Sequence, residues 1–302
     1  MIFKNKKTIH EILTSLFQTY SERVPDVKII TDALIRNNVI SNQLDIINDH
    51  IAFRTMGVNH LGIKSFEKIF LHHGYKRRDF YSFETKKLNA YWYSHHEINM
   101  PRIFISELIV DELSKKTQKI IHKYTNQVKS DPVDDIDLDD SKQVIKFVSS
   151  PLWNLPTIED YEFLLGQSEY ASWVIYNRYF LNHYTISVHE LNDSFNTLEK
   201  FNKLVVKLGI KLNDSGGVIK KSKDGLLLQS SSVANKIKAI FANNKKKLIS
   251  GSYVEFAERR VLPEFKTLKK ELIKPKHRRD GFETSNADRI FESTFTNQVD
   301  HR

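Results

Sequence analysis

Hydrophobic and polar residues alternate along this chain with two periods, one typical of helices and one typical of strands. Residues 8–21 place their apolar side chains on one helical stripe, and residues 27–38 also have a helical pattern. From residue 50 the period shortens to two. HIAFRTM predicts a strand, IKSFEKIFLHHG a helix that ends near Gly74, and YKRRDFYSF, LNAYWYSH and PRIFISEL three further strands. This region therefore predicts the order β-α-β-β-β.

The same order returns about 130 residues later. SELIVDELSKKTQKIIHKYT predicts a helix, SDPVDDIDLDDSK an exposed acidic loop, and the region flanked by Trp153 and Trp173 a helix that ends near residue 178. NHYTISVHE then predicts a strand, and LNDSFNTLEKFNKLVVKLG a helix with Asn192 or Asp193 as its N-cap. GGVIKK, LLLQSSSVANKIKAIF and SYVEFAERR predict three strands. Two such units can pair their sheets, which predicts an α+β fold: a half-barrel with a site on its concave face.

The pattern divides the chain into five parts of one compact domain. We expect an N-terminal helical cap (1–47), a first βαβββ unit (48–110), a helical and acidic insertion (111–178), a second βαβββ unit (179–260) and a C-terminal helical segment (261–302).

Each predicted unit opens with a histidine on its first strand, His50 in NDHIAFRT and His183 in NHYTISVHE. In the first of these strands, His50 and Arg54 point to one face while the apolar residues point to the other. If the units are related by a pseudo-twofold axis, both histidines enter the cavity. A metal site there needs a third ligand, which we expect to be a carboxylate from a neighbouring strand.

SYVEFAERR supplies the best candidate for that carboxylate. Glu255 points away from the bulky apolar residues on either side of it, whereas Glu258 and Glu107, which ends PRIFISEL, stay as alternatives. The chain has no cysteine, so a metal must bind to histidine, carboxylate or water. Two histidines and one carboxylate leave coordination positions open, which suits non-haem Fe(II) and O₂ chemistry, and Arg54 can bind a substrate carboxylate.

The formal net charge is +9, with basic clusters such as NNKKK and KTLKKELIKPKHRR. These clusters alternate with glutamate and apolar residues at helical spacing, which favours a solvated surface over a nucleic-acid interface. No apolar run approaches the ~18 residues of a transmembrane helix. We therefore expect a soluble cytoplasmic protein that contacts neither membrane nor nucleic acid, and we leave its oligomeric state open.

Several segments together resemble the DUF1338 family, whose members include 2-oxoadipate dioxygenase/decarboxylases, also called 2-hydroxyglutarate synthases. The resemblance runs from about residue 48 to 295 and rests on NDHIAFRT, KLNAYWY, RIFISEL, NHYTISVHEL, LLLQSSSVA, GSYVEFAER and RRDGFETSNADRIFEST. It implies a vicinal-oxygen-chelate-like fold. It also implies Fe(II) or another divalent metal on His50, His183 and Glu255, with Arg54 on the distal carboxylate of the substrate.

The implied reaction converts 2-oxoadipate and O₂ to 2-hydroxyglutarate and CO₂, in the context of lysine catabolism. Strand positions add Gln229, Ser231 and Tyr93 as substrate-binding candidates, and the segment around Asp280 as a lid. Two alternatives stay open. One is a vicinal-oxygen-chelate lyase or isomerase that uses another divalent metal, and the other is a non-catalytic protein that binds a small anion or nucleic acid.

Overall fold

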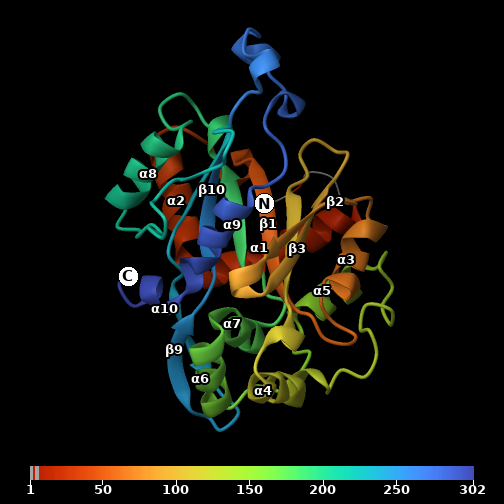
Figure 1. Cartoon of the computed structure of the whole chain (residues 1–302). Coiled ribbons are helices and arrows are strands. Elements are labelled where there is room, and N and C mark those ends of the chain that lie inside the picture. Colours follow the sequence, from red (N-terminus) through yellow and green to blue (C-terminus); the bar gives the residue numbers. More distant parts are fainter. Residues whose placement is uncertain (1–2, 4–6) are drawn as a thin grey trace.

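The computed structural model of the chain describes residue 3 and residues 7–302, and an eight-stranded mixed sheet forms its centre (Figure 1). Across the sheet the strands follow the order β2-β3-β4-β1-β5-β10-β7-β6. Their bounds are β1 (Asn48–Met56), β2 (Lys76–Phe83), β3 (Leu88–Ser94), β4 (Arg102–Leu108), β5 (His183–Ser187), β6 (Lys220–Lys221), β7 (Leu227–Ser231) and β10 (Tyr253–Arg259).

The two halves of this sheet share one plan. The central strands β1 and β5 are antiparallel, whereas β4 is parallel to β1 and β10 is parallel to β5. Counted outward from the centre, one half has β1, β4, β3 and β2, and the other has β5, β10, β7 and β6. In both halves, the first strand of the unit is therefore followed by its last, third and second strands. The sheet is curled into a half-barrel, so the prediction of an α+β fold with two βαβββ units is confirmed.

Helices form the remaining layers. Their bounds are α1 (Thr8–Arg23), α2 (Pro25–Arg36), α3 (Ile63–His72), α4 (Lys115–Thr125), α5 (Ser141–Ser149), α6 (Ile158–Gln167), α7 (Glu169–Asn177), α8 (Leu198–Lys207), α9 (Thr284–Ile290) and α10 (Thr296–Val299). Among the described residues, no helix is both long enough and apolar enough to cross a membrane.

One helix of each unit covers the convex face of the sheet. On α3, Phe66 packs against Phe53 of β1 with ring centroids 4.8 Å apart, and on α8, Phe201 packs against Phe256 of β10 at 4.9 Å. Because side chains alternate along a strand, Glu255 next to Phe256 points to the opposite, concave face.

The C-terminal segment and the insertion cover that concave face. Helix α9 contacts β2, β6 and β7, so it reaches both ends of the sheet, and Figure 1 shows it over the middle strands. Just before α9, the ring of Phe282 lies 5.9 Å from Trp92 of β3 and 4.9 Å from Phe104 of β4. The insertion adds α7, which contacts β1. Segments distant in sequence from the strands therefore enclose the centre of the half-barrel.

One predicted strand is wrong. LLLQSSSVANKIKAIF does not form a single strand, because the chain leaves the sheet after Ser231, where the Ala234 N–H donates to the Ser293 carbonyl. The residues that follow form β8 (Lys236–Ile240), which pairs with β9 (Lys246–Ser250) in a separate two-stranded sheet.

Two predicted helix starts are also wrong. The helix expected over residues 106–125 begins at Lys115, because residues 102–108 belong to β4. Helix α8 begins at Leu198 with Thr197 as its N-cap, whose side chain accepts a hydrogen bond from the Lys200 N–H, so neither Asn192 nor Asp193 has that role.

Candidate metal centre

Three side chains meet on the concave face of the sheet. His50 lies on β1, His183 on β5 and Glu255 on β10. The Oε2 atom of Glu255 lies 3.1 Å from Nε2 of His183 and 3.5 Å from Nε2 of His50. All three side chains are buried, and the atoms that they offer to a metal lie within 4.8 Å of one another. The residues predicted as ligands from distant parts of the sequence are thus neighbours in the structure.

Each histidine is oriented by the residue that precedes it. Nδ1 of His50 lies 2.9 Å from Oδ2 of Asp49, and Nδ1 of His183 lies 2.9 Å from Oδ1 of Asn182. An oxygen at this distance accepts the Nδ1 proton, which leaves a lone pair on Nε2. Metal-binding histidines commonly donate their other ring N–H to such an acceptor. Both imidazoles are therefore turned so that Nε2 faces Glu255.

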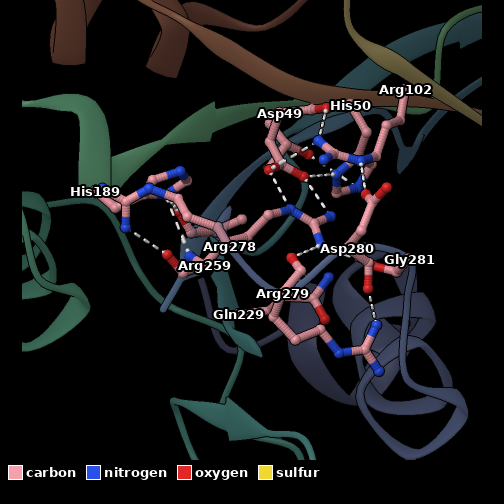
Figure 2. Close-up of polar contacts among 12 residues, drawn as sticks. Asp49, His50, Arg102, His189, Gln229, Arg259, Arg278, Arg279, Asp280 and Gly281 are labelled. Atoms are coloured by element: carbon pink, nitrogen blue, oxygen red, sulfur yellow. Dashed lines mark hydrogen bonds and ion pairs between the residues drawn. The ribbon is translucent and has the colours of Figure 1, made fainter. Parts of the chain in front are cut away.

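Asp49 is itself held by two arginines (Figure 2). The Arg259 guanidinium donates to both of its oxygens, at 2.6 and 2.8 Å, and a nitrogen of Arg102 lies 3.6 Å from Oδ1. Arg259 also donates to the carbonyl of Gly281, and Arg102 pairs with Asp280 at 2.7 Å. The acceptor of the His50 proton is thereby tied to the segment that closes the concave face.

The surroundings of Glu255 and His183 favour the forms of these two side chains that bind a cation. Burial would raise the pKa of Glu255, but the two histidines outweigh it and lower this pKa to about 2. Burial lowers the pKa of His183. For His50, burial also acts downward, but the carboxylates of Glu255 and Asp49 raise its pKa above the ordinary value. The ionised Glu255 and the neutral His183 are in the forms that would hold a divalent metal, whereas His50 would have to lose its proton to act as a ligand.

The other oxygen of Glu255 has a separate partner. Nε2 of Gln229 on β7 donates to Glu255 Oε1 at 2.7 Å. Gln229 was predicted to bind substrate. It lies beside the centre and lines its cavity, so a contact with substrate stays a prediction.

A cavity with mainly apolar walls lies against the three ligands. The ring of Phe282 lies 4.8 Å from that of His50, and Tyr253 stacks on His183 at 4.7 Å. The cavity is lined by His50, Phe104, His183, Gln229, Tyr253, Glu255, Phe282, Ala287, Ile290 and Phe291. The C-terminal segment supplies four of these ten residues, as expected for a segment that covers the site.

Arg54 shares the concave face with His50 and is fully enclosed. Its guanidinium donates to the Thr294 hydroxyl at 2.9 Å and to the Phe291 carbonyl at 3.0 Å, while its Nε has no partner. Among the described residues, no carboxylate forms an ion pair with Arg54. A buried cation with no carboxylate within ion-pair distance is costly, and the faces of Tyr170 and Trp173, each 5.2 Å from its Cζ, offset only part of this cost. Binding of a substrate carboxylate by Arg54 stays a prediction.

The two alternative carboxylates have structural roles instead. Glu107 Oε2 accepts a hydrogen bond from the Ile63 N–H at the start of α3, and Glu258 Oε2 accepts one from the Leu198 N–H at the start of α8, both at 2.9 Å. Each carboxylate therefore satisfies a free N–H at the N-terminus of the helix in its own unit. Glu255 alone among the three lies with the histidines.

The prediction that Tyr93 lies on the face of the site and binds substrate is wrong. Its hydroxyl donates to Glu67 of α3 at 2.6 Å, which places it on the convex face, and strand alternation turns Trp92 toward Phe282 on the concave face instead. Ser231 does lie on the concave face, opposite Glu255 in the β7–β10 register, and its hydroxyl contacts that of Ser293 at 2.7 Å. Substrate binding by Ser231 stays a prediction.

Sequence reasoning missed Arg259, Phe282 and Tyr253. Arg259 follows the carboxylates of SYVEFAERR, where an arginine at a strand end usually points to solvent. Phe282 lies in a loop without strand or helix periodicity. The position of Tyr253, two residues before Glu255, places it on the concave face, and this spacing was the one available signal.

The curled sheet with two βαβββ units gives this chain a vicinal-oxygen-chelate-like fold, and the buried His-His-Glu group at its centre could hold a metal ion. The sequence profile of the 2-oxoadipate dioxygenase/decarboxylase family matches residues 12–274, and the chain belongs to this family.

Three relatives illustrate the similarity. The chloroplastic 2-oxoadipate dioxygenase/decarboxylase of Arabidopsis thaliana is 41% identical over 306 residues, which cover 96% of this chain and 78% of the relative. The crystal structure of the hydroxyglutarate synthase from Oryza sativa, in complex with 2-oxoadipate, superposes with a TM-score of 0.86 at 41% identity and covers 95% of this chain and 92% of that one. A glyoxalase superfamily protein from Ralstonia eutropha shares the fold at 19% identity, with a TM-score of 0.69 and 82% of each chain covered.

Proposed function

We propose that this protein is a non-haem Fe(II)-dependent dioxygenase/decarboxylase that converts 2-oxoadipate and O₂ to 2-hydroxyglutarate and CO₂. The observation that carries the proposal is the buried group of His50, His183 and Glu255, which shares the concave face with Arg54. Membership of the 2-oxoadipate dioxygenase/decarboxylase family supports the same substrate and reaction.

The three side chains fit a divalent metal. Two imidazole Nε2 atoms and one carboxylate oxygen converge in a buried place, and both Nδ1 atoms already have acceptors. One anionic and two neutral ligands on one side of an ion suit Fe(II) and leave positions for substrate and O₂. When bound, Fe(II) supplies the site for a 2-oxo acid and the electrons with which O₂ is activated.

Arg54 is proposed to select a dicarboxylic acid. A 2-oxo acid that binds the metal through its first carboxylate and keto oxygen carries its second carboxylate several bonds away. Arg54 is buried and has no carboxylate partner among the described residues, and its Nε is free to donate. The distal carboxylate would neutralise this charge and fix the orientation of the substrate.

The apolar walls of the cavity are proposed to keep water away from the reacting carbon. Phe104, Phe282 and Phe291 surround the ligands, and two of these three rings come from the C-terminal segment. A dry cavity strengthens the attraction between Arg54 and an anion and limits side reactions.

The test is anaerobic reconstitution with Fe(II), followed by measurement of O₂ uptake, CO₂ release and 2-hydroxyglutarate by mass spectrometry. We expect equal amounts of all three with 2-oxoadipate, and none in the His183→Ala variant. Arg54→Met should raise KM for 2-oxoadipate but change it little for 2-oxohexanoate, which has the same length and lacks the distal carboxylate. Metal binding without O₂ uptake from any 2-oxo acid would overturn the proposal.

A further inference from the structure

The amide of Gln229 lies between a proposed metal ligand and the C-terminal helix α9. On one side its Nε2 donates to Glu255 Oε1 at 2.7 Å. On the other side its Oε1 accepts a hydrogen bond from Nδ2 of Asn286 at 3.1 Å. All three side chains are buried, so each of these groups depends on its protein partners for hydrogen bonding.

The direction of this hydrogen-bond chain is set by the main chain. Nδ2 of Asn286 also lies 3.3 Å from the Leu227 carbonyl and 3.4 Å from the Lys220 carbonyl, and a carbonyl oxygen only accepts. The amide nitrogen of Asn286 must therefore face these oxygens and Oε1 of Gln229. Gln229 is then left with only its NH₂ group to present to Glu255.

We infer that Asn286 is a positioning residue of the metal centre, which acts through Gln229 to keep Oε1 of Glu255 hydrogen-bonded and Oε2 directed at the histidines. With the amide reversed, the Gln229 carbonyl oxygen would face a carboxylate oxygen at the same place and repel it. The inference rests on the metal centre of the proposed function and extends it to a residue on α9, which supplies no ligand.

The test compares Asn286→Asp with the wild-type protein, both loaded with Co(II). The new carboxylate accepts from Gln229 and so reverses its amide. We expect Co(II) binding to weaken by about 10- to 100-fold, the usual effect of losing a group that orients a ligand. The visible absorption of bound Co(II) should also shift, because the geometry of Glu255 changes. Neither readout requires turnover.

Asn213→Asp is the matched control. Asn213 is also a buried asparagine whose amide nitrogen holds the C-terminal segment, through the Arg289 carbonyl at 3.0 Å and the Ser293 hydroxyl at 2.9 Å. None of the hydrogen bonds of its side chain involves Gln229 or Glu255. We expect this variant to lower the unfolding midpoint while Co(II) affinity stays within about threefold of wild type. Equal weakening of Co(II) binding in both variants would overturn the inference.

A double-mutant cycle covers the case in which Asn286→Asp does not fold. If Asn286 acts through Gln229, Asn286→Ala should weaken Co(II) binding in the wild-type background but add nothing in a Gln229→Leu background. Additive effects, or unchanged binding in Asn286→Ala, would overturn the inference, as would a wild-type protein that binds no divalent metal. Tight Co(II) binding that responds to Asn286, without O₂ uptake in the iron form, would reject the proposed function and leave the inference standing.

Discussion

The two βαβββ units share a scaffold but differ at the residues around the metal centre. In the strand registers, His50 lies opposite Arg102 and Ala52 opposite Phe104, while in the second unit the equivalent residue His183 lies opposite Tyr253 and Thr185 opposite Glu255. Glu107 and Glu258 occupy matching places, since each accepts from the first N–H of its unit's helix.

By the same registers, the position of Glu255 corresponds to that of Phe104 in the first unit. Ala52, two residues after His50, lies opposite Phe104, just as Thr185, two residues after His183, lies opposite Glu255. The duplication thus provides two histidines but a single carboxylate. The place of the second carboxylate is taken by an apolar ring that lines the cavity, so that side of the centre has no second anionic ligand.

The largest effect on metal binding should come from placing the phenylalanine of the first unit at the position of Glu255 in the second. Glu255→Phe removes the anionic ligand, so Co(II) affinity should fall by more than about 100-fold, beyond the loss of an orienting group, with turnover undetectable. Isothermal titration with Co(II) measures this. If the two positions are equivalent, adding Phe104→Glu should restore part of the binding. A double variant that binds no better than Glu255→Phe would break the comparison.

The next contrast between the units lies in the residues that accept the Nδ1 protons, which are Asp49 for His50 and Asn182 for His183. Asp49→Asn leaves the buried guanidinium of Arg259 without its counter-charge, which should reduce the free energy of unfolding by about 3–5 kcal/mol. Asn182→Ala removes a neutral hydrogen bond from His183 and should cost about 1 kcal/mol. Urea unfolding of the metal-free proteins measures both. Similar losses in the two variants would show that Asp49 does not act as the counter-ion of Arg259.

The two units should also differ in how they make stability depend on pH. His189 comes six residues after His183 in the second unit, and the residue at the same distance from His50 in the first unit is Met56. Burial lowers the pKa of His189 to about 3, from 6.5. The unfolded chain therefore binds a proton between these values that the folded protein does not, and stability falls as the pH drops from 6.5 toward 3. At about pH 5 this amounts to roughly 2 kcal/mol.

The measurement is the difference in unfolding free energy between pH 7.5 and pH 5, for wild type and His189→Met. The variant makes this position match Met56 and should lose about 2 kcal/mol less on acidification. An identical loss in both proteins would mean that His189 is protonated in the folded state at pH 5.

The smallest expected effects concern the two helix-capping carboxylates. Glu107→Gln and Glu258→Gln each weaken a charge-assisted bond to a helix N-terminus, so each should cost about 1 kcal/mol of stability. Neither should change Co(II) affinity, since neither carboxylate lies with the histidines. Thermal unfolding and Co(II) titration test the pair. Loss of metal binding in either variant would mean that the units differ in more than the ligand position.

The sequence by itself determined the plan of the half-barrel and the two histidines that meet at its centre. Each unit combines strands of period two with one amphipathic helix, and this pattern occurs twice in the chain. Two such units must pair their sheets to bury the apolar faces. Within such a strand, alternation decides which residues share a face, so His50 with Arg54, and Glu255 opposite its apolar neighbours, followed from spacing alone. The same rule, applied without knowledge of which face is concave, led to the wrong side for Tyr93.

Only the tertiary structure decided which carboxylate completes the centre and what surrounds it. Glu107, Glu255 and Glu258 are alike as strand glutamates, and the register between β5 and β10 places one of them beside the histidines and another at a helix end. Asn286 and Phe282 come from a segment whose own periodicity carries no information about the sheet that it covers. Their roles arise from contacts between residues far apart in the chain, which local spacing does not encode.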